Sequence, residues 1–363
     1  MNHFTTRFAT LSLLRVLAAA AQAARAACPK TFKIGPMSSK TFPRMAAVLA
    51  GVLAGSASAA PVYHIIDLGS KFLVTAMNKN GVVVGWKQVA GVGDQPSIYR
   101  NGHWNPIEKG VDAQPAAVDV SGDVVGYESG LGSVLWPRGG GAPVSVGPTH
   151  FRTNDTFVSG VNDDQVVVGS AISKRDRQWH CFRWENGVGK DLNAPRDCIA
   201  GSINRQGWII GYGTSELGAP HTGFIWAGSH FHWFDDQPTA IPASINDEGH
   251  LAGTYEPPGQ FDHAFLYDGT QFIDIGLLPG MDQSFGQHIN DHDEVLGTMN
   301  SFRHGTANFL YSGGQLYDLD ALVDNLGKWH LNVPVGIDND GNVVGYGNLA
   351  GHARSWMAVR ISQ

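Results

Sequence analysis

The chain has 363 residues, of which 43% are hydrophobic and 16% are charged, and its formal net charge is −7. This length ordinarily indicates two domains, but a closed array of short strands reaches the same size as one domain. Seven of the 25 basic residues and none of the 32 acidic residues lie in residues 1–59. The rest of the chain therefore has 18 basic against 32 acidic residues, a formal net charge of −14. This excess of acid makes nucleic acid and anionic lipid poor partners.

Residues 1–59 are expected to be a leader or signal peptide that is removed on export. A positively charged start precedes an apolar run from Met45, and Ala57-Ser58-Ala59 has the small-x-small form of a cleavage site. The apolar run is too short to span a bilayer. We therefore predict a functional start at Met37 or Met45 and a single mature domain over residues 60–363. The mature protein is expected to be secreted or periplasmic.

A short motif recurs seven times in the mature chain. One copy is SINDEGHLAGTY from Ser244, and another is GIDNDGNVVGYG from Gly336. The successive copies end in glycines that are 41 to 48 residues apart, namely Gly85, Gly126, Gly169, Gly211, Gly253, Gly297 and Gly345. A period in this range indicates one supersecondary unit that is stacked or closed into a ring.

The polar part of this motif has two interpretations. The side-chain oxygens of residues 246–248 resemble a calcium loop. However, the acidic positions vary between copies, and Asn246 followed by Gly249 matches a type I turn that ends in a residue with positive φ. The motif therefore predicts a turn. Gln165 and Asp293 replace the glycine in two copies, where we expect mild backbone strain.

The strands of one unit can be read around this turn. The apolar run after the turn, such as VVVG, lacks alternation and is expected to be buried on both faces. The residue two places before the turn is small in most copies, as expected for inner strands near a common axis, and His288 is the exception. An aromatic strand and a hairpin partner follow, with turn signals at Asn186-Gly187 and Asp268-Gly269. Seven such units of four antiparallel strands predict an all-β fold, a seven-bladed β-propeller.

The two ends of the mature chain predict how the ring closes. YHIIDLG at residues 63–69 is a fourth-type strand before the first complete unit, and HARSWMAVRI at residues 352–361 is a third-type strand with no strand after it. We expect the N-terminal strand to complete the last blade.

The two cysteines of the mature chain are Cys181 and Cys198. An even number of cysteines in an exported chain permits a disulfide. Two free buried thiols are the alternative.

The repeat carries a family resemblance. His263-Ala264-Phe265, followed by D-[IL]-G and IN-x-x-G-x-V-x-G elements, resembles the bacterial extracellular HAF-repeat proteins over residues 63–361. The resemblance implies a secreted, propeller-like protein without an established catalytic set. His180 and His352 match the first position of the triplet, whereas other copies lack histidine there.

Strand alternation predicts where ligands bind. The connections from the second to the third strand, and from the fourth strand to the next blade, are expected to be long and to form one face, which we name the long-loop face. The remaining connections form the opposite, short-turn face. Binding residues commonly lie on loops that a rigid scaffold positions, so we expect binding at the long-loop face. The candidates are Arg175, Arg177, Trp179, Glu216, Tyr255, Glu256, Phe261, Arg303 and His304, with His288 in the axial channel.

Other chemistry receives less support from the sequence. His230-x-His232 could bind a metal from one face of a strand, but no other unit repeats it, so a surface strand is favoured. We expect no metal and no cofactor. The leading interpretation is a monomeric binding or interaction propeller for a glycan, peptide or protein. The alternatives are a carbohydrate-active enzyme with paired acids in the axial funnel, and a purely structural surface protein.

Overall fold

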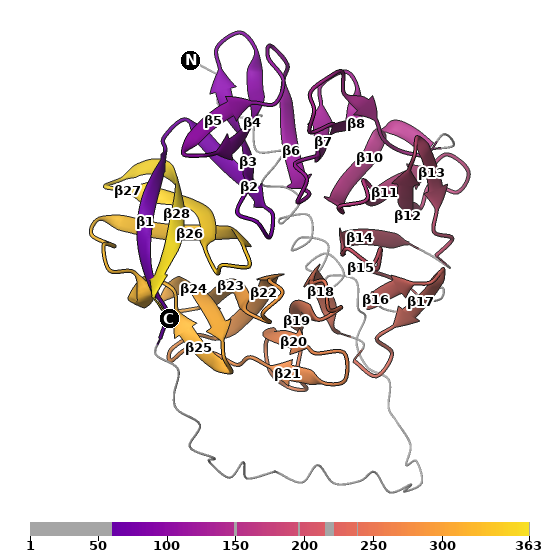
Figure 1. Ribbon diagram of the computed structural model, residues 1–363. Helices are drawn as coiled ribbons and strands as arrows, with labels where there is room; N and C mark the ends of the chain where they lie inside the picture. The colour runs from indigo at the N-terminus through magenta and orange to yellow at the C-terminus, as the bar shows by residue number, and fades with distance from the viewer. Residues whose placement is uncertain (1–59, 149–150, 195–196, 215–220, 238, 363) are drawn as a thin grey trace, which may run out of the picture. The chain divides into compact units, whose positions relative to one another are not determined.

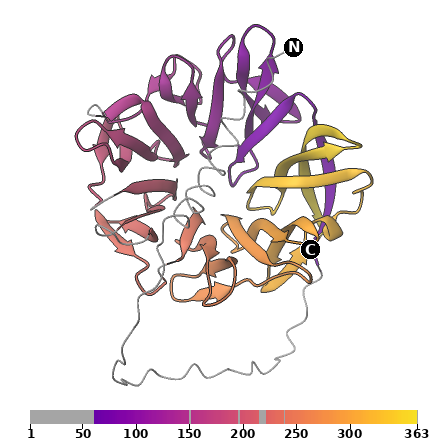
Figure 2. The same ribbon diagram turned by 180° about the vertical axis from the view of Figure 1, so that it is seen from behind.

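The computed structural model describes residues 60–148, 151–194, 197–214, 221–237 and 239–362, so the predicted leader lies outside the described residues. The described residues form seven antiparallel four-stranded sheets, arranged as the blades of a β-propeller (Figure 1). Figure 2 shows the same ring from behind. The predicted all-β, seven-bladed architecture is confirmed. In this described part of the chain, no helix is long and apolar enough to cross a bilayer.

The blades follow one another in chain order. Blade 1 contains β2 (Phe72–Met77), β3 (Val83–Val89), β4 (Gly93–Arg100) and β5 (His103–Pro106). Blade 2 contains β6 (Ala113–Val118), β7 (Val124–Glu128), β8 (Gly132–Trp136) and β9 (Val144–Ser145). Blade 3 contains β10 (Phe151–Val161), β11 (Val167–Ser173), β12 (Trp179–Glu185) and β13 (Val188–Asp191). Blade 4 contains β14 (Cys198–Ile203), β15 (Ile209–Gly213), β16 (Thr222–Ala227) and β17 (His230–Trp233).

The remaining blades complete the ring. Blade 5 contains β18 (Ile241–Ile245), β19 (Leu251–Tyr255), β20 (His263–Tyr267) and β21 (Phe272–Asp274). Blade 6 contains β22 (Gln283–Ile289), β23 (Val295–Ser301), β24 (Gly305–Ser312) and β25 (Gln315–Asp318). Blade 7 contains β26 (Trp329–Ile337), β27 (Val343–Leu349), β28 (His352–Ser362) and β1 (Val62–Gly69), and the 3₁₀ helix η1 (Asp320–Leu322) precedes it.

Close packing explains the repeated glycine of the second strand. Gly253 lies opposite Phe265 in the sheet, and a Cβ added at Gly253 would stand 2.3 Å from the carbonyl oxygen of Ile241 and 2.7 Å from the Phe265 ring. The same crowding occurs at Gly345, where a Cβ would lie 2.4 Å from the fully buried Trp356. Any side chain at this position would therefore push the first strand and the core aromatic apart.

The repeated turn also has the expected geometry. Gly249 has a φ of +85°, and Gln165 and Asp293 adopt a φ of +58° without being glycine. The predicted left-handed positions are therefore confirmed in both substituted copies. At Asp293 the side chain contributes its own contacts, because its Oδ1 accepts a hydrogen bond from Asn246 Nδ2 at 3.0 Å.

The first strand closes the ring as predicted. β1 pairs antiparallel with β28 from Val62 opposite Ser362 to Gly69 opposite Ser355. Tyr63 is fully buried, and its hydroxyl donates to the carbonyl of Gly341 at 3.0 Å. Arg360 donates to the same hydroxyl at 2.8 Å and to Glu294 of blade 6 at 2.8 Å. A buried ion pair therefore connects the closing strands to the neighbouring blade.

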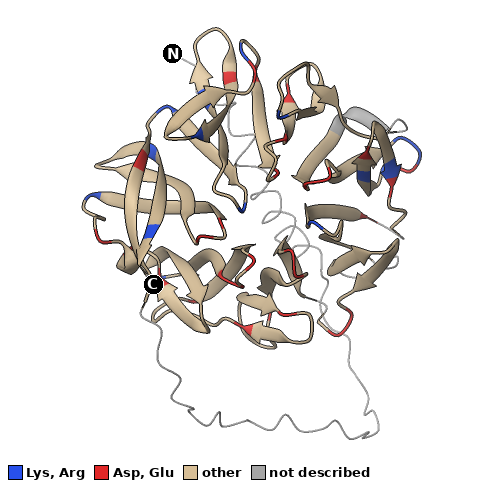
Figure 3. Ribbon diagram, in the orientation of Figure 1, with Lys and Arg blue, Asp and Glu red and all other residues tan. Residues whose placement is uncertain are grey.

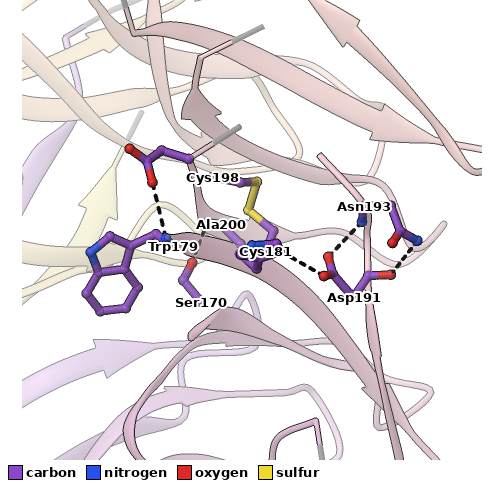
Figure 4. The surroundings of a disulfide bond; sticks show 9 residues. Ser170, Trp179, Cys181, Asp191, Asn193, Cys198 and Ala200 are labelled. Atoms are coloured by element: carbon purple, nitrogen blue, oxygen red, sulfur yellow. Dashed lines mark hydrogen bonds and ion pairs between the residues drawn. A yellow bond between two sulfur atoms is a disulfide. The ribbon is translucent and has the colours of Figure 1, made fainter. Parts of the chain in front are cut away.

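A disulfide joins two neighbouring blades. Cys181 in β12 and Cys198 in β14 are linked, with their Cα atoms 5.2 Å apart (Figure 4). Both side chains are fully buried in a core shared with Phe224. Beside the disulfide, the backbone N–H of Ala200 in blade 4 donates to Ser170 Oγ in blade 3 at 2.9 Å (Figure 4). The bond therefore fixes the packing of blade 4 against blade 3.

Candidate functional site

The loops of the long-loop face differ strongly between blades. Three of the connections from the second to the third strand are long in sequence, and they belong to blades 3, 4 and 5. In blades 1, 2, 6 and 7 the same connection is a short hairpin turn, for example from Ser301 to Gly305. The expectation that all of these connections are long is therefore wrong. In blade 1, for example, β3 continues to Val89 and β4 begins at Gly93, so most of the predicted loop is part of these two strands.

Two aromatic pairs stand at this face. Trp179 at the start of β12 contacts Phe157 of β10, with ring centroids 5.6 Å apart. Phe261 in blade 5 contacts Phe302 in blade 6 across the blade boundary, with ring centroids 5.1 Å apart. Phe157, Phe261 and Phe302 are 46%, 52% and 69% exposed. The sequence analysis named Trp179 and Phe261 but missed their two partners. Phe302 could have been found, because it is an apolar aromatic residue in a predicted loop.

Basic side chains flank both pairs. Arg175 and Arg177 are exposed in the loop before Trp179, and Arg177 has a left-handed φ of +62°. Arg303 and His304 follow Phe302 and are also exposed. Their backbone N–H groups donate to Ser301 Oγ, which holds this short turn. Carboxylates lie beside them, since Asp176 is in the same loop as the arginines and Asp282 accepts the N–H of Phe302. The face therefore carries two separate patches that combine aromatic rings with charged side chains.

Tyr255 and Glu256 have different surroundings. Tyr255 is half-buried, and its ring meets His263 and Phe265 edge-on at 6.4 and 6.3 Å. Burial, together with a hydrogen bond to Asp274 and the charge of that carboxylate, raises the pKa of Tyr255 to about 12. Glu256 is exposed, and its backbone is bonded to Thr239. Glu216 lies outside the described residues.

The histidine of the HAF triplet is part of a contact between the third and fourth strands. His263 Nδ1 lies 3.0 Å from Asp274 of β21, and His180 Nδ1 lies 2.7 Å from Asp191 of β13. In blade 7 the register places Arg354 at this position, and its guanidinium donates to Asp67 of β1 at 2.6 Å. The alignment of His352 with the triplet is therefore wrong by two residues. The side chain at this position therefore links the third and fourth strands of its blade.

The pair His230 and His232 lies on the outer strand β17, where both side chains are exposed. His230 Nδ1 contacts the carbonyl of Gly228 at 3.0 Å. Within the residues that the structure describes, no group of histidine, cysteine and acidic side chains has the arrangement of a metal site.

At the axis, the turn asparagines form a ring that links the blades. Asn204 Nδ2 donates to the carbonyl of Asn246 at 3.0 Å, and Asn246 Nδ2 donates to the carbonyl of Asn290 at 3.1 Å. Asn78, Asn162 and Asn290 make the same bond to their next blade. The two remaining blades have Asp119 and Asp338 here, and a carboxylate has no N–H to donate.

The next residue of each turn forms a second ring, which is charged in five of the seven blades, with Lys79, Asp163, Arg205, Asp247 and Asp291. Lys79 of blade 1 reaches across the axis to Asp247 of blade 5, and its Nζ lies 4.0 Å from Asp163 and 3.9 Å from Asp291. Burial opposes the charge on Lys79, but the three carboxylates outweigh it and raise its pKa. The inner turns of several blades carry acidic residues (Figure 3). Lys79 therefore crosses the short-turn mouth of the channel.

A cavity of about 320 Å³ lies on the axis behind this mouth. The small residues two places before each turn line it, and so does His288, whose position beside the channel was predicted. The accessible surface of His288 opens into the cavity, and burial in the surrounding protein lowers its pKa to about 4. The imidazole is therefore neutral at pH 7.

Comparisons with known proteins extend only to the fold. No family model and no curated protein matches the sequence. The propeller domain of the trilobed protease from Pyrococcus furiosus, described as having an open velcro topology, is similar over 81% of this chain and 96% of that chain (TM-score 0.57, 12% identity). YCF48 bound to D1 peptide is similar over 83% of this chain and 98% of that chain (TM-score 0.50, 12% identity).

A third similar structure is a puromycin-hydrolyzing peptidase of Mycobacterium tuberculosis (TM-score 0.55, 12% identity), where the similarity covers 84% of this chain and 54% of the peptidase. At 12% identity these similarities show the β-propeller fold. In contrast to an open topology, this chain pairs β1 with β28 in blade 7.

Proposed function

We propose that the protein is a secreted or periplasmic binding propeller of the HAF-repeat type, and that it recognises a protein, peptide or glycan through the long-loop face. One observation carries the proposal: two aromatic pairs, Phe157–Trp179 and Phe261–Phe302, stand at this face beside arginines, and every ring except the half-buried Trp179 is exposed. Aromatic and arginine side chains dominate the binding energy of recognition surfaces. YCF48, a propeller of similar extent, holds a peptide, which supports a peptide or protein ligand.

The carboxylates around Lys79 in the turn ring favour binding over hydrolysis. A glycosidase needs two carboxyl groups that face the substrate. Here Asp247 Oδ1 accepts the backbone N–H of Arg205, and Asp291 Oδ1 accepts the backbone N–H of Asp247. Asp163 accepts the N–H of Val120 in the same way. These carboxylates connect neighbouring turns and face Lys79. Their structural contacts therefore explain why acidic residues stand at the axis, and no catalytic role is needed to explain them.

Export can be tested by finding the N-terminus of the exported protein. The hypothesis of export rests on the basic, acid-free segment before Ala60. N-terminal sequencing of protein from the periplasm or medium should begin near Ala60. A cytoplasmic chain that keeps residues 37–59 would refute export.

The binding face can be tested with arrays of glycans, peptides and proteins, probed with the full-length chain. We expect Trp179→Ala or Phe302→Ala to weaken the strongest array interaction about tenfold or more, because truncation of a central aromatic residue costs more than about 1.4 kcal/mol. Val188→Ala is the matched control, since Val188 is an exposed apolar residue at the start of β13, next to the short turn from β12. If the control weakens binding and the loop variants do not, the face is assigned wrongly.

A further inference from the structure

The first strand of every blade has a partly exposed residue near its long-loop end. This residue lies twelve positions before the repeated glycine of its blade, as Leu73 does before Gly85, and directly precedes the partner of that glycine in the sheet. The seven residues are Leu73, Gln114, Phe157, Ile199, Ile241, Phe285 and Val333. Because the first strand is the innermost strand of each blade (Figure 1), they surround the axis, and we name them the apolar ring.

The apolar ring is not part of the blade cores. Phe157 is 46% exposed and stands between buried neighbours, and Ile199, Ile241 and Phe285 are partly exposed in the same way. Within the described part of the chain, these three residues and Leu73 belong to none of the hydrophobic clusters that pack the blades. The second-strand residues opposite four ring members are aromatic and not buried either, namely Trp86, Tyr127, Tyr212 and Tyr346. Apolar residues gathered on one face indicate an interaction site.

Four carboxylates lie on the same face at blades 1 and 2. Asp94 Oδ2 accepts a hydrogen bond from Gln114, the polar member of the ring, at 2.6 Å, and Asp112 Oδ1 accepts the backbone N–H of Asp94 at 2.7 Å. Glu128 is buried at the end of β7, and its burial, together with the charge of Glu108, raises its pKa. Of the ion pairs among the described residues, none includes any of these four carboxylates, which we name the acidic cluster.

These two features together select one kind of ligand. The apolar ring offers few hydrogen-bonding groups, so the hydroxyls of a sugar placed on it would lose their hydration without new partners. An apolar side chain would instead bury the ring residues and itself. At the acidic cluster, a positive charge from the ligand would offset the repulsion between Glu108 and Glu128. A peptide segment can carry both an apolar and a basic side chain.

From these observations we infer that the ligand of the long-loop face is a basic peptide segment, which places an apolar side chain on the apolar ring and a lysine or arginine at the acidic cluster. The inference rests on the proposed function, because it names the ligand class of the same face. Phe157 belongs both to the ring and to the aromatic pair with Trp179, and Gln114 connects the ring to Asp94. One extended segment can therefore contact the ring, the cluster and an aromatic patch.

A positional-scanning library of fluorescein-labelled hexapeptides, read by fluorescence polarisation with the full-length chain, tests the ligand class. We expect the tightest pools to have leucine, isoleucine or phenylalanine at one position and lysine or arginine at another. Glutamine in place of the basic residue should weaken binding about threefold or more, because it removes an attraction between charges. If acidic pools bind as tightly as basic ones, or if no pool binds, the inference is wrong.

Substitutions test the two contact sites separately. Ile241→Thr keeps a branched Cβ and should weaken the selected peptide about threefold or more, because it places a hydroxyl on the ring. Asp112→Asn should weaken the basic peptide about threefold and leave its glutamine analogue unchanged, a difference that a folding defect would not produce. The matched controls are Val144→Thr in the outer strand β9 and Asp340→Asn in a short turn, where both residues are exposed, and neither should change binding.

The two proposals for this face fail in different ways. If Trp179→Ala and Phe302→Ala weaken the peptide while Ile241→Thr or Asp112→Asn binds as tightly as the wild type, the aromatic patches hold the ligand and this inference is wrong. If a glycan binds and no peptide pool does, the face is still a binding face and the ligand class is wrong. If only the ring and cluster variants weaken the peptide, this inference holds and the aromatic patches are assigned wrongly.

Discussion

Asp119, one of the two carboxyls that replace the turn asparagine at the axis, sets a pH dependence. Asp119 Oδ1 accepts the N–H groups of Gly122 and Asp123 at 2.6 and 2.7 Å, while its buried Oδ2 has no partner among the described residues. Burial raises the pKa of Asp119 to about 6, and the charge of Asp123 adds to this effect. The unfolded chain has the ordinary pKa near 3.8. The folded state therefore holds the proton more tightly, and the free energy of unfolding falls as pH rises from about 4 to about 6.

We predict that Asp119→Asn stabilises the protein at neutral pH. The amide can donate to the carbonyl of Asn162, as Asn78 donates to that of Asp119, and it removes the buried charge. Thermal or denaturant unfolding at pH 7.5 should show a gain of about 1 to 3 kcal/mol. At pH 4 the gain should shrink, because the protonated Asp119 can donate as the amide does. The reverse change, Asn204→Asp, should destabilise at pH 7.5. An unchanged or lower melting temperature for Asp119→Asn would contradict this account.

At the scale of the element, β1 closes the propeller and should control its stability. Deleting residues 60–69 removes the buried Tyr63, Ile65 and Leu68 and leaves β28 as an open edge. Burial of each such side chain contributes about 1.5 to 3 kcal/mol, so the total approaches the net stability of a domain. We expect a strongly lowered melting temperature and concentration-dependent association through the edge, seen by light scattering.

Two controls separate closure from other effects of truncation. Deleting residues 1–59 alone should change neither the melting temperature nor the association. Tyr63→Phe keeps the strand and removes the hydroxyl that binds Arg360 and Gly341, so its effect should be intermediate. A chain that begins at Ser70 and melts like the mature protein would show that β1 does not hold the ring.

The disulfide between blades 3 and 4 gives a second prediction for the elements. Closing the 17-residue separation between Cys181 and Cys198 should stabilise the protein by about 2 to 4 kcal/mol. Reduction, or Cys198→Ser, should therefore lower the melting temperature of exported protein, and intact mass should show one disulfide before reduction. Two thiols that react with alkylating reagent in freshly exported protein would exclude the bond.

For the whole molecule, periodicity explains why the fold was predictable. The turn residues and the glycine opposite Phe265 recur in each blade because every blade repeats the same packing, so seven copies define seven sheets. Ring closure followed from the unpaired strand types at the ends. The register of β28 was less predictable, because blade 7 lacks the His-Ala-Phe triplet. Arg354 takes the place of the histidine there and donates to Asp67.

The candidate sites were less predictable, for physical reasons. The pairing of Phe261 with Phe302 depends on two loops from different blades meeting in space, which no local pattern encodes. The members of the apolar ring share one spacing to the repeated glycine, but their exposure depends on how the blades pack, which that spacing does not encode. The contact of Lys79 with Asp247 spans 168 residues and exists only because the ring is closed.

Hydrogen exchange tests the central claim, that the long-loop face binds the ligand, most directly. The full-length chain would be measured alone and with the strongest-binding array component. We predict slower exchange of backbone amides in residues 174–179 and 300–304, next to the two aromatic pairs, and no change in the short hairpin at residues 186–188. Protection confined to the short-turn hairpins, with unchanged exchange at both aromatic patches, would contradict the account.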